Sequence, residues 1–313
     1  MKILKAFQFR LKPSAAQDQV LRKYMGCARF TYNRALALQK ELYEKEQRKL
    51  SYPEMARQLV VWKRDDETSF LKEAPAQILQ QKLMDLEKSY TNFFKRGAGF
   101  PKFKKRGRRE TFRLPDAHQI TLDQKNERVQ LPKIGWLRYR HSRDIIGTIK
   151  NVTISFEAGE WHISFQVEQE IETPIHPSNE MVGIDLGIAQ FATLSNGDHI
   201  SALNSLKNHA SSLKRCQKKL SRKKKGSQNW KKHCKKLARK HKKIRNCRKD
   251  FLHKASTMLS KNQALIVVEN LKIGNMSRSA RGTGQEPGRN VRAKSGLNRS
   301  ILDQGWGEFL RQL

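Results

Sequence analysis

The sequence predicts a mixed α/β chain of more than one domain, in which a helical segment and a small β-barrel precede a second α/β domain that carries a basic helical hairpin. At 313 residues the chain is longer than a typical single domain. Apolar residues recur at helical spacing through residues 15–94, whereas short strand-like segments fill residues 111–171. A second set of strand-like runs begins at residue 181 and is interrupted by a long stretch of Lys and Arg.

The charge balance predicts a polyanionic partner. Lys and Arg number 64 and Asp and Glu number 29, which gives a formal net charge of +35. Neutralising phosphates supplies most sequence-independent affinity for nucleic acid, so nucleic acid is the expected partner and a membrane surface is the weaker alternative. No apolar run approaches the length of a transmembrane helix, and residues 1–12 lack the apolar core of a signal peptide. We therefore expect a cytoplasmic protein.

The four cysteines predict neither a disulfide framework nor a zinc ribbon. Cys27, Cys216, Cys234 and Cys247 contain no Cys-x-x-Cys pair. The last three lie near apolar positions of the basic stretch, where we interpret them as small apolar side chains. A metal cluster with a neighbouring histidine is the weaker alternative, because the spacing fits no standard zinc pattern.

The first part of the chain predicts a strand followed by helices. Residues 3–11 alternate as a strand, and Pro13 and Ser14 mark a helix start. Gly26 is a candidate break in the first helix. Arg29 and other cations of this helix could meet phosphates or could simply be solvated. The predicted helices span residues 15–46, 52–62 and 76–94.

A basic loop is expected from residue 95 to residue 109, where Gly and Pro alternate with Lys and Arg. Phe100 and Phe103 stand between its charges, as stacking on bases would require, although two aromatic side chains could equally anchor the loop on its own domain. We favour contact with nucleic acid. The cations concerned are Lys102, Lys104, Lys105, Arg106, Arg108 and Arg109.

Strand-like segments then predict a small β-barrel or half-barrel that the N-terminal strand completes. Residues 157–160 supply a hairpin turn between the last two segments. The segments are residues 120–122, 128–131, 136–139, 148–156 and 161–168. The expected domains are residues 1–12 and 110–172 for the barrel, 13–109 for the helical domain, 173–180 for a linker and 181–313 for the second domain.

One carboxylate stands inside the apolar, strand-like run that begins the second domain. Residues 181–187 have the sequence Met-Val-Gly-Ile-Asp-Leu-Gly. An unpaired carboxylate among residues that normally seek a core is costly, so Asp185 needs a structural partner or a bound cation. Gly183 and Gly187 remove side-chain bulk where a ligand backbone could approach. The favoured interpretation is a ligand of a divalent-metal nuclease site, and the alternative is an Asp in a turn or a buried salt bridge.

Two more strands, at residues 191–194 and 199–202, are joined by a good hairpin turn. Three antiparallel strands whose first carries a central Asp are how a ribonuclease H-like, or RuvC-like, domain would begin. Residues 264–268 form a continuous apolar run, typical of a buried central strand, and end at Glu269. This second carboxylate could lie beside Asp185 on a neighbouring strand and complete two corners of a metal site.

The stretch from residue 207 to residue 249 is dense in Lys and Arg and holds no Asp or Glu. Leu206, Leu213 and Leu220 repeat every seven residues, and a second seven-residue series follows Gly226. This spacing predicts a basic antiparallel helical hairpin within residues 206–255, whereas the alternative is a solvated, partly disordered charge run. Beyond it we expect a mobile basic loop over residues 277–299 and a helix over residues 301–313.

With both carboxylates located, the chain resembles the TnpB family, transposon-encoded proteins often labelled OrfB-type transposases and ancestral to type V CRISPR effector nucleases. The resemblance covers essentially the whole length. It rests on motifs in order and in register, namely Phe9–Pro13, Gly26–Asn33, Phe100–Lys104, Gly183–Gly187, Val267–Leu271 and Gly305-Trp306.

The resemblance implies an RNA-guided DNA endonuclease of the bacterial or archaeal cytosol, associated with the nucleoid, whose guide derives from the transposon's own transcript. It implies that the helical domain is a recognition lobe, the barrel a wedge domain and residues 181–313 a RuvC domain. Asp185 and Glu269 become catalytic acids that bind Mg²⁺ or Mn²⁺. Pairing of two copies is left open. The residues expected to contact RNA or double-stranded target DNA are Arg29, Asn33, Lys102, Lys104, Lys105, Arg106, Lys223, Lys224 and Lys225.

One departure from the family pattern matters. The family continues with a zinc module of paired Cys-x-x-Cys motifs and a third catalytic Asp, and neither is present, so we expect no zinc and an incomplete RuvC domain. Asp303 and Glu308 lie in the helix before that region and are not assigned the missing role. The alternative function is a truncated protein that binds guide RNA and DNA without cutting, as a regulator or transposition modulator. A weaker third class is a helix-turn-helix DNA binder that uses residues 15–46.

Overall fold

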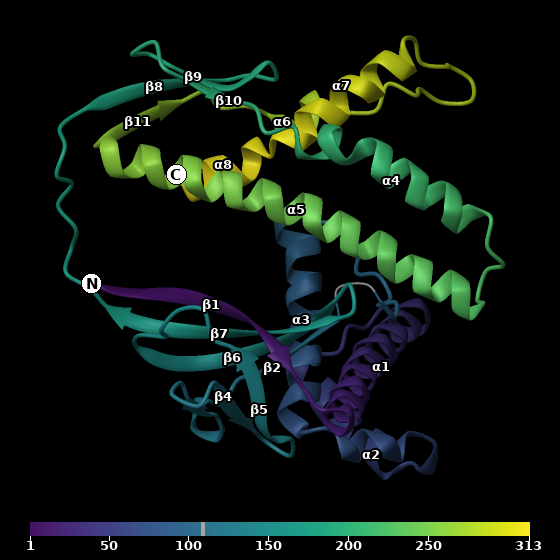
Figure 1. The fold of residues 1–313 in the computed structure, drawn as a ribbon. Helices are drawn as coiled ribbons and strands as arrows, with labels where there is room; N and C mark the ends of the chain where they lie inside the picture. Colours follow the sequence, from purple (N-terminus) through teal and green to yellow (C-terminus); the bar gives the residue numbers. More distant parts are fainter. Residues whose placement is uncertain (108–109) are drawn as a thin grey trace. The chain divides into compact units, whose positions relative to one another are not determined.

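The computed structural model describes residues 1–107 and 110–313, which divide into two compact units, residues 1–173 and 174–313 (Figure 1). The predicted basic-loop residues Arg108 and Arg109 lie outside the described residues. Each unit combines helices with a β-sheet and has its own cluster of buried apolar side chains. The prediction of a mixed α/β chain is therefore confirmed.

The sheet of the first unit is curled and antiparallel, with the strand order β2-β6-β7-β1-β5-β4-β3. The N-terminal strand β1 lies in its middle, between β7 and β5. Among the described strands no pairing joins β2 to β3, so of the two predicted arrangements they form the half-barrel. The bounds are β1 Lys2–Lys12, β2 Glu110–Leu114, β3 Thr121–Asp123, β4 Arg128–Leu131, β5 Gly135–Arg140, β6 Thr148–Glu157 and β7 Glu160–Glu170.

The hairpin between β6 and β7 turns where the sequence predicts it. Ala158 and Gly159 have φ angles of 54° and 87°. Two consecutive residues with positive φ match the right-handed twist of the strands that they join. The turn sets Trp161 into the core, where its indole Nε1 donates a hydrogen bond of 2.6 Å to Asp18 on the first helix.

Of the three helices of this unit, the first and the third pack on each other and on β2, and the second packs on the third. The first begins with a capping box, because Ser14 and Gln17 each bond the backbone N–H of the other. Ring contacts join this helix to the sheet, as Tyr24 lies 6.1 Å from Phe112 between centroids. The helices are α1 Ala15–Glu46, α2 Tyr52–Arg64 and α3 Ala76–Arg96, with short 3₁₀ segments at Asp66–Glu73 and Ala117–Gln119.

The predicted break at Gly26 is wrong, because α1 continues through it. The neighbours Met25, Cys27 and Ala28 are buried, and this packing outweighs the cost of about 1 kcal/mol that a glycine adds inside a helix. Residues 15–46 are thus one continuous helix with no turn, and the helix-turn-helix alternative lacks its defining geometry.

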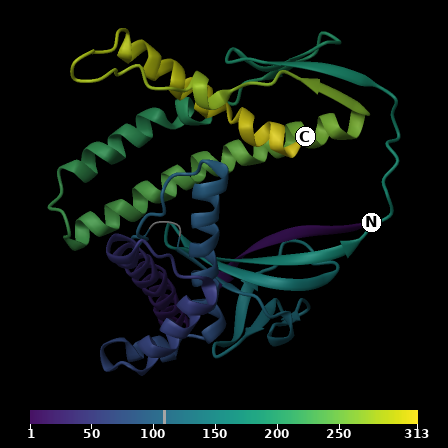
Figure 2. The ribbon, with the colours of Figure 1, turned by 180° about the vertical axis from the view of Figure 1, so that it is seen from behind.

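The sheet of the second unit has the order β10-β9-β8-β11. The first three strands in sequence form the predicted antiparallel meander, whereas β11 pairs with β8 in parallel. Helices α5 and α8 cover one face, and Figure 2 shows α8 lying along α5, as it does in Figure 1. The bounds are β8 Met181–Leu186, β9 Gln190–Leu194, β10 His199–Ser201 and β11 Leu265–Val268.

The basic stretch forms the predicted helical hairpin. Helices α4 (Ser205–Ser221) and α5 (Gln228–Asn262) pack on each other, and the chain turns at Gly226, whose φ is 87°. The seam holds Leu213, Cys216 and Ile244, all buried, which agrees with the interpretation of Cys216 as a small apolar side chain. The alternative of a partly disordered charge run is wrong.

The end of the chain differs from the prediction in two places. Residues 291–299, expected to be loop, belong to α7 (Val291–Gln304), and the predicted helix over 301–313 is broken before α8 (Trp306–Gln312). The break lies at Gly305, which has a φ of 78° and whose Cβ, if present, would lie 3.0 Å from the Arg248 side chain. A four-residue helix, α6 (Ile273–Met276), precedes them.

Asp303 is a buried carboxylate that joins three helices. It lies on α7 and accepts hydrogen bonds from the backbone N–H of Leu206 at 2.8 Å and from the Ser205 hydroxyl at 3.1 Å, at the start of α4. Arg248 on α5 donates to it at 2.7 Å. Because N–H groups at a helix start have no intrahelical partner, the carboxylate satisfies α4 while the guanidinium neutralises it.

Within the residues that the structure describes, none of the helices combines the length and the apolar character needed to cross a membrane.

We predict that Gly26→Ala stabilises the protein by about 0.5–1 kcal/mol, because a Cβ at this helical position meets nothing within 4 Å and alanine favours the helix. Gly97→Ala is the matched control. Gly97 has a φ of 62° at the end of α3, so the same methyl group should destabilise by about 1 kcal/mol there. Equilibrium denaturation measures both, and equal shifts would contradict the prediction.

We predict that Asp303→Ala destabilises the second unit by about 3 kcal/mol, because it strips the cap from α4 and leaves a half-buried guanidinium unpaired. The control is Asp250→Ala, which removes an exposed pair with Lys254 and should cost about 0.5 kcal/mol or less. Denaturation gives the free energies, and hydrogen–deuterium exchange should show faster exchange in the first turn of α4 only for the Asp303 variant.

Candidate active site and nucleic-acid interface

Asp185 lies in β8 on the face of the sheet opposite the core. Val182, Ile184 and Leu186 are buried, whereas Asp185 is exposed, because successive side chains of a strand point to opposite faces. The expectation that the acid stands among core residues is therefore wrong in this respect. Its carboxylate faces outward, and burial does not force it to find a partner.

Glu269 directly follows β11, the neighbour of β8. The parallel pairing sets Leu265 opposite Met181 and Val268 opposite Ile184. One step further along the same register, Glu269 falls beside Asp185. Neighbouring strands lie about 4.8 Å apart, so the two acids occupy adjacent backbone positions. The juxtaposition of Asp185 and Glu269 stays a prediction, and the register of β8 and β11 favours it.

The strand β11 is an edge strand in the described part of the chain, not the buried central strand that its apolar run predicts. Leu265 and Val267 are 52% and 59% exposed. A continuous apolar run indicates burial on both faces. In the described residues the helices cover only one face of this sheet, and β11 has a single neighbour.

The two carboxylates have no partner in the part of the protein that the structure describes. Within residues 1–107 and 110–313, neither the Asp185 nor the Glu269 side chain makes a hydrogen bond or an ion pair. Two carboxylates side by side repel each other unless a cation lies between them. In a chain with a net charge of +35, none of the described cations is placed to neutralise this pair.

Asp185 and Glu269 are the type of side chain that binds divalent metal ions. Carboxylate oxygens are the ligands that Mg²⁺ and Mn²⁺ prefer, and these two carry no competing partner. They are two ligands only. The part of the chain that the structure describes contains no group of three or more His, Cys, Asp or Glu side chains placed to hold a metal ion.

The glycines that flank Asp185 have structural roles. A Cβ at Gly187 would lie 2.9 Å from the carbonyl oxygen of Gln190, so the tight turn between β8 and β9 excludes a side chain there. At Gly183 a Cβ would make ordinary contact with Ser195 at 3.6 Å. The turn alone accounts for Gly187, so this glycine does not require the predicted role of making room for a ligand.

The two other acids near the end of the chain are already paired. Asp303 caps α4, as described above. Glu308 accepts hydrogen bonds from the Arg311 guanidinium, at 2.5 Å and 3.0 Å, and these lower the pKa of the Glu308 carboxyl to about 2. Asp303 is buried, and Glu308 lies on the short α8. Neither is available beside Asp185 as a further metal ligand in this arrangement.

The basic loop after α3 is anchored by α1. The Asn33 side chain donates to the carbonyl oxygen of Lys104 at 3.0 Å and accepts from its N–H at 2.7 Å. Both polar ends of the amide are used by the loop backbone, so Asn33 fixes where the loop lies. The side chains of Lys102, Lys105 and Arg106 are exposed.

Aromatic side chains fix the same loop from the other side. Phe100 packs against Tyr90 and Phe93 of α3, with ring centroids 5.7 Å and 5.3 Å apart. The Lys40 ammonium lies 5.3 Å from the Phe100 ring and 5.1 Å from the Phe103 ring. These contacts support the alternative of anchoring, yet both rings stay about half exposed, and Phe100 borders a groove of about 480 Å³.

Arg29 has a local partner, since its guanidinium pairs with Glu110 at 2.5 Å where β2 begins. In the second unit Lys223, Lys224 and Lys225 lie at the turn between α4 and α5. Lys224 and Lys225 are exposed there, and Lys223 is half-buried.

Two protein-family models match parts of this chain. A family model described as "Probable transposase", OrfB_IS605, matches residues 164–280. A model described as a "Helix-turn-helix domain", HTH_OrfB_IS605, matches residues 1–48, although in this chain those residues hold β1 and the single helix α1.

Two solved structures match more loosely. "Cryo-EM structure of the Cas12f1-sgRNA-target DNA complex" matches with 12% identity and a TM-score of 0.48, over 96% of this chain and 88% of that one. "Cryo-EM structure of CRISPR-Cas12f Ternary Complex" matches with 14% identity and a TM-score of 0.33, over 90% and 69%. At these scores the likeness adds nothing to the assignment.

Curated relatives match over the whole chain. The chain is 53% identical over 313 residues to "Putative RNA-guided DNA endonuclease InsQ" of Escherichia coli (strain K12), which covers 100% of this chain and 77% of that protein. It is 31% identical over 315 residues to "Putative RNA-guided DNA endonuclease" of Streptomyces pristinaespiralis, over 99% and 74%. The chain therefore belongs to the TnpB family of OrfB-type transposon-encoded proteins.

Proposed function

We propose that the chain acts as an RNA-guided, metal-dependent DNA endonuclease that uses Asp185 and Glu269 for hydrolysis. The observation that carries this proposal is the pair of carboxylates on β8 and just after β11, which have no partner among the described residues. The printed names of two relatives, at 53% and 31% identity, support the RNA-guided activity. The net charge of +35 supports polyanionic partners, here a guide RNA and a target DNA.

The proposed domain roles follow the chain. Residues 13–109 form the recognition lobe, residues 1–12 and 110–172 the wedge domain, and residues 181–313 a RuvC domain of the ribonuclease H type, with residues 173–180 as the linker. The meander β8-β9-β10 and the parallel neighbour β11 support the last of these assignments, because they are how such a domain is expected to begin.

Asp185 and Glu269 would hold Mg²⁺ or Mn²⁺. Such an ion would supply Lewis-acid polarisation of a phosphate and would lower the pKa of a water molecule. The contribution of the chain is to fix two carboxylates on a rigid sheet. Asp185 lies within β8, and Glu269 follows β11 by one residue, so neither acid depends on a long loop for its position.

Exposed cations supply the proposed contacts with phosphates. Lys102, Lys105 and Arg106 lie on the loop that Asn33 anchors, and a fixed loop loses less entropy when it binds than a mobile one does. Lys104 shares this loop, and its ammonium lies 4.6 Å from the Tyr32 ring. We propose that Arg29 and Asn33 act by positioning this surface, and that Lys223, Lys224 and Lys225, on the hairpin of the second unit, also contact phosphates.

A second candidate function is guide-directed binding of DNA without cleavage. One observation favours it, namely that the described residues offer two carboxylates, whereas two-metal hydrolysis uses shared carboxylates to clamp ions about 3.5–4 Å apart. Under this alternative the chain occupies DNA as a regulator or transposition modulator.

We predict that Asp185→Asn or Glu269→Gln lowers the affinity for Mn²⁺ at least tenfold and abolishes any Mg²⁺-dependent DNA cleavage, while RNA binding is unchanged. The reason is that each variant removes one of two adjacent charged ligands. Calorimetry measures the metal affinity, and a guide-programmed cleavage assay measures activity. Asp198→Asn is the control, because it removes an exposed carboxylate from the turn between β9 and β10.

The outcomes separate the two functions. Metal-dependent cuts in the unaltered protein that vanish in both variants support the endonuclease. Guide-dependent DNA binding and metal binding without cuts support the second candidate. Cleavage that persists in Asp185→Asn contradicts the site assignment under either function.

A further inference from the structure

A groove lies between α1 and α3 in the first unit, where both helices end. Its volume is about 480 Å³, within the range of roughly 300–1,000 Å³ that ligand pockets occupy. We call it the aromatic groove, because five of the ten residues that line it are aromatic, namely Tyr43, Tyr90, Phe93, Phe94 and Phe100.

The aromatic side chains of the groove are largely exposed. Tyr43 is 56% exposed, Phe94 66% and Phe100 41%. The rings also touch one another, since Phe93 lies 5.0 Å from Phe94 and 5.3 Å from Phe100 between centroids. A contiguous exposed apolar surface marks a site of interaction in monomeric proteins. The described residues of the first unit therefore leave one joined apolar surface open to a partner.

Two ammonium groups stand over this surface. The Lys40 nitrogen lies 5.3 Å from the centroid of the Phe100 ring. The Lys49 nitrogen lies 5.6 Å from the Tyr90 ring and 5.8 Å from the Phe94 ring. Neither lysine makes a hydrogen bond or an ion pair within residues 1–107 and 110–313. The rings attract the ammonium groups but do not neutralise their charge.

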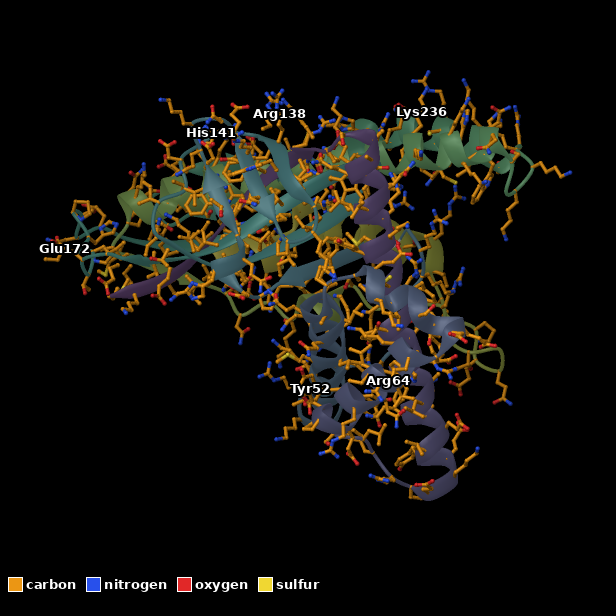
Figure 3. All side chains as sticks on the ribbon, turned by 90° about the horizontal axis from the view of Figure 1, so that it is seen from below. Tyr52, Arg64, Arg138, His141, Glu172 and Lys236 are labelled. Atoms are coloured by element: carbon orange, nitrogen blue, oxygen red, sulfur yellow. The ribbon has the colours of Figure 1, made fainter. Side chains whose placement is uncertain are left out.

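The buried Gln39 side chain fixes the segment that carries Lys49. Its amide donates to the carbonyl oxygen of Leu50 at 2.7 Å and accepts from the Leu50 N–H at 3.0 Å. Tyr52 then begins α2, and Figure 3 shows it among the helices of the unit, apart from Arg138 on the sheet. Because both polar ends of the amide are used, the rim of the groove is ordered before a ligand arrives, which lowers the entropy cost of binding.

The unpaired charges of the groove favour an anionic partner. The Arg48 guanidinium is bonded to Glu54, so the unpaired cations of the lining are Lys40 and Lys49. One acid, Glu44, also lines the groove and makes no ion pair within the described residues. Two unpaired cations against one acid leave the rim positive.

We propose that the aromatic groove binds an acidic, amphipathic helix of a partner protein. Such a helix lays apolar side chains spaced at i, i+3, i+4 and i+7 into an apolar groove. Its carboxylates would pair with the ammonium groups of Lys40 and Lys49, which have no acid of their own. The inference concerns a protein partner and does not depend on the proposed function.

A nucleobase suits this groove less well than apolar side chains do. Bases stack on the faces of aromatic rings, and here a base would compete with the Lys40 and Lys49 ammonium groups for those faces. The Phe100 ring already meets Phe93 edge-on, at 83° between the ring planes. Phosphates are matched best by the planar fork of arginine, and the one arginine of the lining is bonded to an acid.

The test uses a fluorescein-labelled peptide that carries Leu and Trp on one helical face and Glu on the other, titrated with the full chain and followed by fluorescence anisotropy. A scrambled peptide of the same composition lacks the apolar face, so it measures the attraction of a chain with a net charge of +35 for any acidic peptide. We expect the amphipathic peptide to bind about tenfold more tightly than the scrambled one. Equal affinities overturn the proposal.

A variant of the apolar surface tests the groove itself. Phe94→Ala should weaken binding of the amphipathic peptide about tenfold, because it removes an exposed ring from the contact surface. Val61→Ala is the control, since Val61 is also exposed but lies on α2 outside the groove. Unchanged affinity in Phe94→Ala, or equal losses in both variants, overturns the proposal.

Charge variants test the rim. Lys40→Gln with Lys49→Gln should weaken binding about three- to tenfold. Lys23→Gln with Lys45→Gln is the matched control, because it removes two cations of α1 that are already paired with acids. Glu44→Gln should strengthen binding about two- to threefold, since the lining acid no longer repels the peptide. Equal losses in the two double variants, or weaker binding in Glu44→Gln, contradict the proposal.

A single-stranded oligonucleotide is the competing occupant. The net charge alone lets the chain bind it, so the decisive result is whether that binding depends on Phe94. We expect Phe94→Ala to leave the oligonucleotide affinity within about twofold, whereas a loss as large as that of the peptide assigns the groove to bases and overturns the proposal. None of the substituted side chains is buried, so each variant should keep the melting temperature of the unaltered chain. If Phe94→Ala unfolds, the charge variants decide the outcome.

Discussion

The parallel pairing of β8 with β11 is the constraint on which the second unit depends. A tight turn cannot join parallel neighbours, so the chain must leave the sheet after β10 and return to start beside β8. Here α4 and α5 form that crossover, and the last turns of α5 bury Leu252 and Leu259 against the sheet. The basic hairpin is thus also the element that returns the chain in the register where Glu269 falls beside Asp185.

The acids of the second unit differ in whether the protein compensates their charge. Asp303 is buried and accepts hydrogen bonds from α4 and from Arg248, which compensate its charge. Glu308 is held by Arg311. Asp185 and Glu269 receive no hydrogen bond or ion pair within residues 1–107 and 110–313, although cations outnumber acids in the chain. Two neighbouring carboxylates without compensation are what supports the proposed cation site.

The sequence predicted which elements form but not what covers them. Helical spacing and turn residues located α1 to α5 and the strands other than β2, and the carboxylates at 185 and 269 were expected to be neighbours. Burial was harder. The apolar run 264–268 does not indicate that β11 has one neighbour among the described strands. The outward direction of Asp185 follows from strand alternation, which is hard to recognise in a glycine-rich run. Gly305 breaks the last helix with a φ of 78°, and a side chain there would meet Arg248, which is distant in sequence.

Positive charge alone does not locate a nucleic-acid surface in a chain with a net charge of +35, because cations are everywhere. Candidate nucleic-acid contacts differ from other cations in two ways: no acid neutralises their charge, and the fold holds their position. Under the proposed function, exposed cations contact phosphates and not bases. Since such contacts carry no sequence information, target choice under the proposed function falls to base pairing with the guide RNA.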